Sequence, residues 1–254
     1  MSKFAPQTNY FEKALRYRKL YNFIFWSALI FSIVFSLLNK SDIVNCISIF
    51  SIIIISILKY IIESYQEKAE EKRRTDLFDN ALGTMYSLEP SIDYYDSDEI
   101  GNGIYKLIVN VFENSLYSLE VSTKMKDKEM HKNVLLIIVV LVFAIYGFSR
   151  SNTALPILQL FLSQYFILNL IAINKYNSKV EYIYNEIINM FSDGLRNNSK
   201  STNKYKGKII KIIVEYESNI SNLKVFLDSD IFNELNSDIM DKWIGIKNKC
   251  NIKG

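Results

Sequence analysis

The sequence predicts an all-α membrane protein with four transmembrane helices, arranged as two hairpins, and a cytoplasmic helical domain. The first observation is four apolar stretches without charged residues, at 20–38, 43–58, 134–148 and 154–173. A helix crosses the hydrocarbon core of a bilayer in about 20 residues. Two stretches have that length. The second reaches it if the helix continues to residue 62, and the third requires local thinning of the bilayer.

The second observation is the uneven distribution of basic residues. Of the 30 Lys and Arg residues, only Lys40 and Arg150 lie in the short loops between paired stretches. Basic residues next to membrane helices favour the cytoplasmic side. We therefore expect a multi-pass membrane protein, with both termini and the middle segment in the cytoplasm and the two hairpin tips outside.

This topology divides the chain into five segments. A cytoplasmic amphipathic lead-in covers 1–19, and the first transmembrane hairpin covers 20–62. A cytoplasmic helical segment covers 63–133, the second hairpin covers 134–173, and a cytoplasmic helical tail covers 174–254.

Apolar residues recur every three or four positions in the cytoplasmic segments, which predicts amphipathic helices that pack together. The second membrane helix is expected to continue as far as Pro90, and a helix from Ile104 to run into the third membrane helix. In the tail, Gly194 and the run 197–204 interrupt the helical pattern. Asp228 or Ser229 is a candidate N-cap for the last helix.

The sequence offers few groups for catalysis. It has one histidine, His131, and two cysteines, Cys46 and Cys250, which form no metal-binding pattern. It lacks a phosphate-binding loop and a nucleophile elbow. The acidic loop 91–103 lacks the ligand spacing of a calcium loop, so a mobile loop is the simpler interpretation. We predict no catalytic residue, no metal site and no cofactor.

Basic residues on either side of the first hairpin form a candidate ligand site: Arg16, Arg18, Lys72, Arg73 and Arg74. Guanidinium and ammonium groups bind anions such as a nucleotide phosphate. Alternatively, these residues set the topology and form ion pairs with acidic residues one helical turn away, at Glu67, Glu70 and Glu71.

Polar side chains also follow single faces of the membrane helices. The candidate pore-lining residues are Asn22, Ser32, Ser36, Asn45, Ser48, Ser56, Gln159 and Ser163. Polar groups are costly against lipid and often mark a pathway. The same pattern is also typical of close packing between membrane helices. No charged residue lies deep in the bilayer, which argues against a proton-coupled transporter or a voltage sensor.

The layout resembles a family of bacterial membrane effectors. The lead-in at 11–19 (FEKALRYRK) enters a tight hairpin, and a charged helix continues into RRTDLFDNAL at 73–82. A second hairpin and a helical tail, with its segment 215–243, follow. This plan is similar to that of the SMODS-associating four-transmembrane effectors. The resemblance implies a role in antiphage defence, in which a cyclic nucleotide made on infection binds or oligomerises the effector, which then breaches the inner membrane.

Two functions from different classes remain open. The first is a pore-forming effector that oligomerises, because four helices in one subunit enclose little space. Its partners would be the lipid bilayer, a cyclic nucleotide and further copies of the chain. The second is a non-conducting scaffold or receptor that docks a soluble partner through the amphipathic faces at 77–86 and 231–246. The missing catalytic groups disfavour an enzyme, and the net charge of +3 disfavours a nucleic acid polymer as partner.

Overall fold

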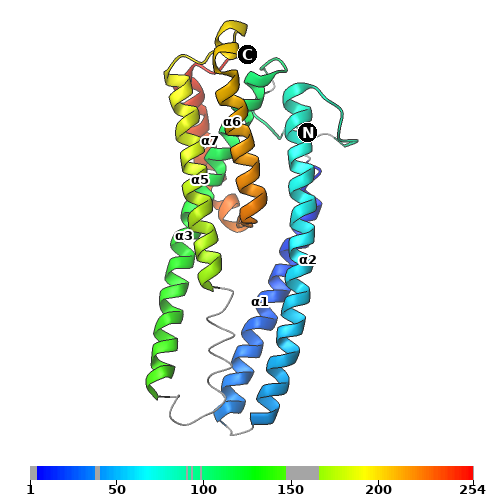
Figure 1. Cartoon of the computed structure of the whole chain (residues 1–254), viewed down its shortest axis with the longest axis vertical. Coiled ribbons are helices and arrows are strands. Elements are labelled where there is room, and N and C mark those ends of the chain that lie inside the picture. The colour runs from blue at the N-terminus through cyan, green and yellow to red at the C-terminus, as the bar shows by residue number, and fades with distance from the viewer. Residues whose placement is uncertain are drawn as a thin grey trace. The chain divides into compact units, whose positions relative to one another are not determined.

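The computed structural model describes residues 5–37, 41–89, 91–92, 94–97, 99–146 and 166–253. Every element assigned within these ranges is an α-helix, which confirms the all-α class. In chain order the helices are α1 (Thr8–Leu37), α2 (Ser41–Leu82), α3 (Ile104–Tyr146), α5 (Phe166–Ser192), α6 (Ser199–Leu223) and α7 (Ser229–Cys250) (Figure 1).

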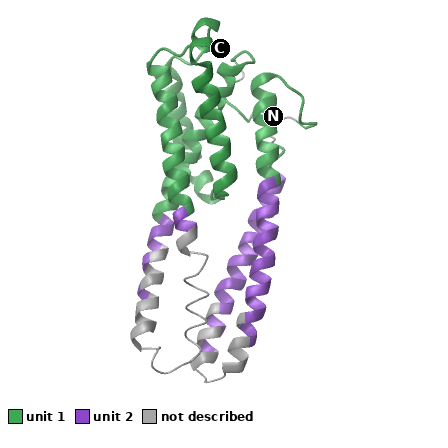
Figure 2. Cartoon of the chain, in the orientation of Figure 1, with its two compact units in different colours: residues 1–8, 68–127, 172–254 green, residues 9–67, 128–171 purple. Residues whose placement is uncertain are grey.

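The chain divides into two compact units (Figure 2). Unit 1 comprises residues 1–8, 68–127 and 172–254, and unit 2 comprises residues 9–67 and 128–171. The helices α2, α3 and α5 each contribute residues to both units without a break in the helix.

The two longest helices follow the sequence prediction, with one correction. Helix α2 has 42 residues, and α3, with 43 residues, begins at Ile104 as predicted. Helix α2 ends at Leu82, well before Pro90. The reason is Gly83, whose φ of 70° is a left-handed conformation that glycine adopts without a steric penalty and that commonly ends helices. Its N–H still donates to the carbonyl of Asp79 at 2.9 Å.

Capping residues define the helices of the tail. Asn198 caps α6, because its side-chain oxygen accepts a hydrogen bond from the Ser201 N–H at 2.8 Å. The break between α5 and α6 therefore covers only residues 193–198, and most of the run 197–204 is helical, contrary to the sequence prediction. Asp228 caps α7, as predicted, by accepting from the N–H groups of Asp230 and Ile231.

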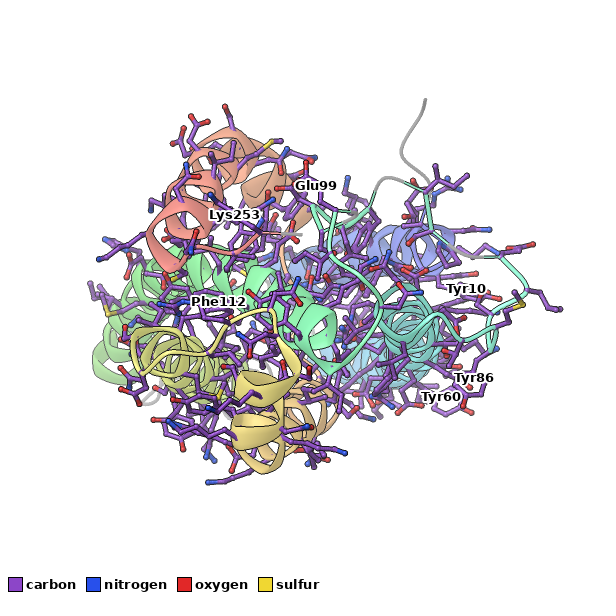
Figure 3. The ribbon with its side chains drawn as sticks, turned by 90° about the horizontal axis from the view of Figure 1, so that it is seen from above. Tyr10, Tyr60, Tyr86, Glu99, Phe112 and Lys253 are labelled. Carbon is purple, nitrogen blue, oxygen red and sulfur yellow. The ribbon has the colours of Figure 1, made fainter. Side chains whose placement is uncertain are left out.

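Unit 1 has a close-packed apolar core. Its largest fully buried side chains include Leu77, Phe112, Ile183, Phe191, Tyr216 and Trp243. The ring of Phe112 stacks on that of Phe191 with centroids 5.6 Å apart, and meets Trp243 edge-on at 5.4 Å. Figure 3, seen from above, shows Phe112 with helices of this unit around it.

Unit 2, in contrast, leaves large apolar side chains exposed. Phe23 on α1 is 70% exposed, and Phe50 on α2 is 67% exposed. Among the described residues, one helical stretch, Ile49–Leu82, is long and apolar enough to cross a membrane, and little of its apolar part is buried. It includes most of the second predicted span. The other three predicted spans stay predictions.

Candidate functional site

The candidate site is a group of charged side chains in unit 1 where α2 meets α6. Arg73 is four residues from both Ala69 and Leu77, which are fully buried, so the helical period turns its side chain inward. Glu217 follows Ile213 by four residues on the buried face of α6. Each helix thus carries a charged residue beside buried apolar side chains.

Arg73 is held by two carboxylates. Its Nη2 donates to Oε2 of Glu217 at 2.6 Å, and its Nε donates to Oε2 of Glu70 at 2.7 Å. The side chains of Arg73 and Glu217 are each only 10% exposed. Burial opposes the charged guanidinium, but the two carboxylates outweigh burial and raise the pKa of Arg73 well above its usual value. Arg73 is therefore always a cation.

Arg74 and Tyr216 complete the cluster. Arg74 donates from Nε to the same Oε2 of Glu217 at 3.2 Å and from Nη2 to the hydroxyl of Ser221. The guanidinium carbon of Arg73 lies 6.0 Å from the centroid of the Tyr216 ring, within cation–π range. Burial raises the pKa of Tyr216 well above its usual value, so the phenol stays neutral. The Arg73–Arg74–Glu70–Glu217 group is called the arginine cluster below.

The arginine cluster has no net charge, since two arginines face two glutamates. It is also not saturated: Nη1 of Arg73 and Oε1 of Glu217 are buried and have no hydrogen-bond partner among the described residues. Buried polar atoms without partners are rare and destabilising. Because Arg74 already donates a hydrogen bond to Glu217, an anion that approached Arg74 would compete with that carboxylate.

Two carboxylates on α2 fasten the loop that follows it. Asp79 accepts three hydrogen bonds from this loop, at 2.6 to 2.9 Å, from Tyr86 N–H, Ser87 N–H and Thr84 Oγ1. Burial disfavours its charge, but these bonds prevail and lower the pKa of Asp79. Asp76 accepts from the Ser91 N–H at 2.8 Å. Here burial dominates and raises the pKa of Asp76.

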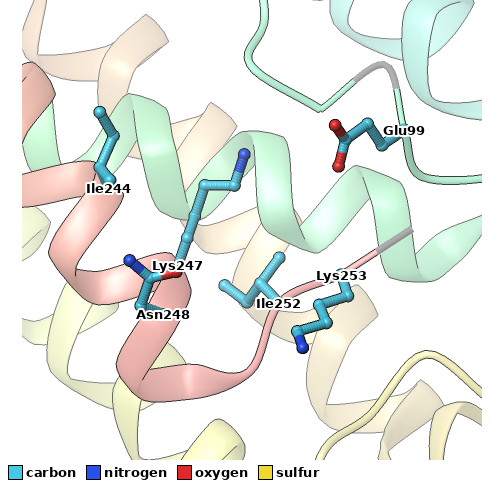
Figure 4. A pocket seen from close by; sticks show the side chains of 6 residues that line it. All are labelled: Glu99, Ile244, Lys247, Asn248, Ile252 and Lys253. Atoms are coloured by element: carbon cyan, nitrogen blue, oxygen red, sulfur yellow. The ribbon is translucent and has the colours of Figure 1, made fainter.

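A surface pocket lies at the C-terminal end of α7, lined by Glu99, Ile244, Lys247, Asn248, Ile252 and Lys253 (Figure 4). The Nζ of Lys247 donates to the carboxylate and to the backbone carbonyl of Asp96, both at 3.0 Å. That ammonium group is therefore already neutralised. The remaining charges, on Glu99 and Lys253, have opposite signs and select no class of ligand.

The structure places the predicted ligand-binding residues in different surroundings. Arg73 and Arg74 lie together in the arginine cluster, and Lys72, next to them on α2, is exposed. Arg16 and Arg18 lie on α1, in unit 2. The side chain of Arg16 is 80% exposed and faces a glutamate one turn earlier on α1 at 4.0 Å.

The side chains of two predicted pore-lining residues are described. Asn22 is half-buried on α1. Ser56 is exposed on α2, and its hydroxyl donates to the carbonyl of Ile52 at 2.8 Å, so the polar group is satisfied within its own helix. Four others lie on α1 or α2 with side chains outside the description: Ser32, Ser36, Asn45 and Ser48. Two lie outside the described residues altogether: Gln159 and Ser163.

Sequence reasoning missed Glu217, the residue that both arginines share. The signal was present, because an acidic residue interrupts the apolar pattern of 209–220 on its buried side. A buried carboxylate requires a cationic partner. Its position therefore predicts an arginine or lysine on the facing helix, without saying which one.

The chain matches no protein-family model, no curated protein and no solved structure. Within the described residues, no group of His, Cys, Asp and Glu side chains is placed to hold a metal ion. Its function must therefore be inferred from its own residues and their geometry.

Proposed function

We propose that this protein is a multi-pass membrane effector that assembles from several copies and permeabilises the inner membrane when its helical unit 1 receives a signal. The observation that carries the proposal is the change along α2. In unit 2 this helix exposes Phe50, Ile53 and Ile57, and in unit 1 it buries Arg73 and Asp76. Large exposed apolar surfaces mark contact with a membrane or another protein.

Continuous helices give unit 1 a means to act on the membrane helices. Helices α2, α3 and α5 each supply residues to the core of unit 1 and to the apolar unit 2. A ligand that favours a second packing of the unit 1 core would therefore also shift the membrane helices. The four thin helices of one subunit enclose little space, so a pore requires several copies.

The arginine cluster suggests how an anionic signal acts. The side chain of Arg74 is 37% exposed, whereas that of Arg73 is 10% exposed. A phosphate group would draw Arg74 away from Glu217 and loosen the contact between α2 and α6. The layout resembles that of the SMODS-associating effectors. This resemblance implies that the protein acts in antiphage defence and that the anionic signal is a cyclic nucleotide.

Depolarisation of the membrane tests the effector function. Induced expression of the chain together with a cyclic-nucleotide synthase should collapse the signal of a membrane-potential dye. Ser56→Phe should reduce the depolarisation if Ser56 faces the pore, and the adjacent Ile57→Phe is the matched control on another face of α2. No depolarisation, with or without the synthase, would remove the proposal.

Cysteine labelling tests the topology with both termini in the cytoplasm. In a chain with Cys46→Ser and Cys250→Ser, an impermeant maleimide applied to intact cells should label Asn152→Cys, at a predicted hairpin tip. It should label Lys200→Cys only after the cells are permeabilised. Labelling of Lys200→Cys in intact cells would overturn the topology.

The alternative is a non-conducting membrane scaffold that docks a soluble partner. Its expected docking faces, 77–86 and 231–246, give much of their apolar surface to the core: Leu77, Ala81, Ile239 and Trp243 are all buried. The residues of these faces that stay exposed, such as Met85 and Tyr86 in the first and Met240 in the second, are the surface left for a partner. A single stoichiometric soluble partner, combined with no toxicity on expression, would favour the scaffold.

A further inference from the structure

The loop between α2 and α3 carries large apolar side chains that the core does not use. Leu88 is 98% exposed, Met85 is 93% exposed and Tyr86 is 76% exposed. Figure 3 shows Tyr86 at the rim of the molecule. These residues belong to unit 1, where the apolar residues of the helices are mostly buried. Exposed apolar clusters of this kind are typical of protein interaction sites.

The loop is held in place, although its side chains are exposed. Asp79 binds the N–H groups of Tyr86 and Ser87, and Asp76 binds the N–H of Ser91. The backbone around Met85 and Leu88 is thus fixed before any partner arrives. A fixed loop loses less conformational entropy on binding than a mobile one.

The same segment is strongly acidic. Residues 83–103 contain no Lys, Arg or His and five acidic residues, namely Glu89, Asp93, Asp96, Asp98 and Glu99. Glu89 and Glu99 are exposed. A partner for this loop must therefore combine apolar side chains with positive charge.

The segment 199–214 of α6 has those two properties. Residues 199–214 contain no acidic residue and five lysines, namely Lys200, Lys204, Lys206, Lys208 and Lys211. On the side away from the core, Ile210 is 47% exposed and Val214 is 60% exposed. Lys208 already pairs with Glu186 at 3.1 Å and Lys211 with Glu215 at 3.7 Å. The exposed lysines left for a partner are therefore Lys200, Lys204 and Lys206.

We propose that the α2–α3 loop of one copy of this chain binds the segment 199–214 of α6 of a second copy. The exposed Glu89 and Glu99 then meet the lysines of 199–206, and Met85 and Leu88 meet Ile210 and Val214. Because the two surfaces differ, each bound pair keeps one loop and one α6 surface open, so the contact builds a ring or a filament. The inference rests on the proposed function, because an effector pore requires several copies.

Complementary charge reversals in the full chain, purified in detergent, test this contact. The first variant carries Glu89→Lys and Glu99→Lys, which makes the loop basic. The second carries Lys204→Glu and Lys206→Glu, which makes α6 acidic. Each variant alone should self-associate at least about tenfold more weakly than the unaltered chain in sedimentation velocity, since like charges then face each other. An equimolar mixture should associate again, because the basic loop of one variant fits the acidic helix of the other.

Two results would overturn the contact. One is a mixture that stays as dissociated as its components while circular dichroism shows both variants helical and folded. The other is a loop-reversed variant that self-associates as well as the unaltered chain but loses a stoichiometric soluble partner, which would assign the loop to that partner.

Disulfide crosslinking gives an independent measurement. In the Cys46→Ser, Cys250→Ser background, Leu88→Cys with Val214→Cys should yield crosslinked dimers and higher species under mild oxidation. The control pairs Leu88→Cys with Met240→Cys, because Met240 is 45% exposed but lies on α7. Equal crosslinking of the two pairs would contradict the proposal.

Failure of the contact and failure of the effector function give different results. If the mixture associates but expression never depolarises the membrane, the contact stands and the effector function falls. If expression depolarises the membrane and the charge reversals change neither association nor depolarisation, the effector function stands and the contact falls.

Discussion

The two units of this chain treat the same kinds of residue in opposite ways. In unit 1, Ile183 is fully buried and Arg73 is enclosed, whereas in unit 2 Ile53 is 51% exposed. On α2 alone, an isoleucine is exposed and an arginine is buried, the reverse of the usual pattern in a soluble protein. The difference teaches that unit 1 is stabilised by its own core, while the described part of unit 2 leaves large apolar side chains uncovered.

The largest effect is expected in the arginine cluster of unit 1. Glu217→Leu should lower the free energy of unfolding by about 3 to 5 kcal/mol, because it leaves the buried Arg73 with Glu70 alone. Adding Arg73→Met should recover most of that loss, since the uncompensated charge is then gone. Denaturant unfolding in detergent measures both. A double variant no more stable than Glu217→Leu would show that the pair does not act as a buried ion pair.

A matched truncation in the two units sharpens the contrast directly. Ile183→Ala should lower the free energy of unfolding by about 2 to 5 kcal/mol, because it opens a cavity in a packed core. Ile53→Ala should change it by less than about 0.5 kcal/mol in detergent. Equal losses would mean that Ile53 is packed against protein, and the contrast between the units would fail.

The loop carboxylates predict opposite pH dependences within unit 1. The folded-state pKa of Asp79 is lowered, so its stabilisation is present above the ordinary carboxyl pKa of about 3.9 and is lost as the pH falls through the folded-state value. The pKa of Asp76 is raised, so its contribution is present below that ordinary value and is lost as the pH rises through the folded-state value.

Asp79→Asn should therefore lower the free energy of unfolding at neutral pH by about 1 kcal/mol. The variant should also no longer show the part of the acid-induced loss of stability that Asp79 causes. Asp76→Asn should remove the loss of stability that Asp76 causes in the unaltered chain as the pH rises through its folded-state pKa. Thermal unfolding of each variant between about pH 3 and about pH 6 separates them. Identical pH profiles for the two variants would contradict the assigned shifts.

The smallest effect is expected at an exposed ion pair of unit 1. Lys124 pairs with Glu234, and both side chains are well exposed, at 41% and 62%. Lys124→Met should change the free energy of unfolding by less than about 0.5 kcal/mol, because water screens the pair. A loss as large as that of Glu217→Leu would show that burial is not what distinguishes the arginine cluster.

Local patterns in the sequence predicted much of the helical structure. The periodicity from Ile104 onward and the Asp228 cap both appear in the structure as predicted. The predicted end of α2 at Pro90 was wrong, because Gly83 and the hydrogen bonds accepted by Asp79 end the helix earlier. A glycine that ends a helix and one that the helix includes look alike in the sequence.

The sequence by itself determined the helices and the separation of apolar stretches from charged ones, because both depend on neighbours within a few turns. Only the tertiary structure decided that Arg73 is buried against Glu217, 144 residues further along the chain. The physical reason is that the buried guanidinium is compensated by a carboxylate that another helix brings to it. That meeting depends on how α2 and α6 pack, which no local pattern in either helix specifies.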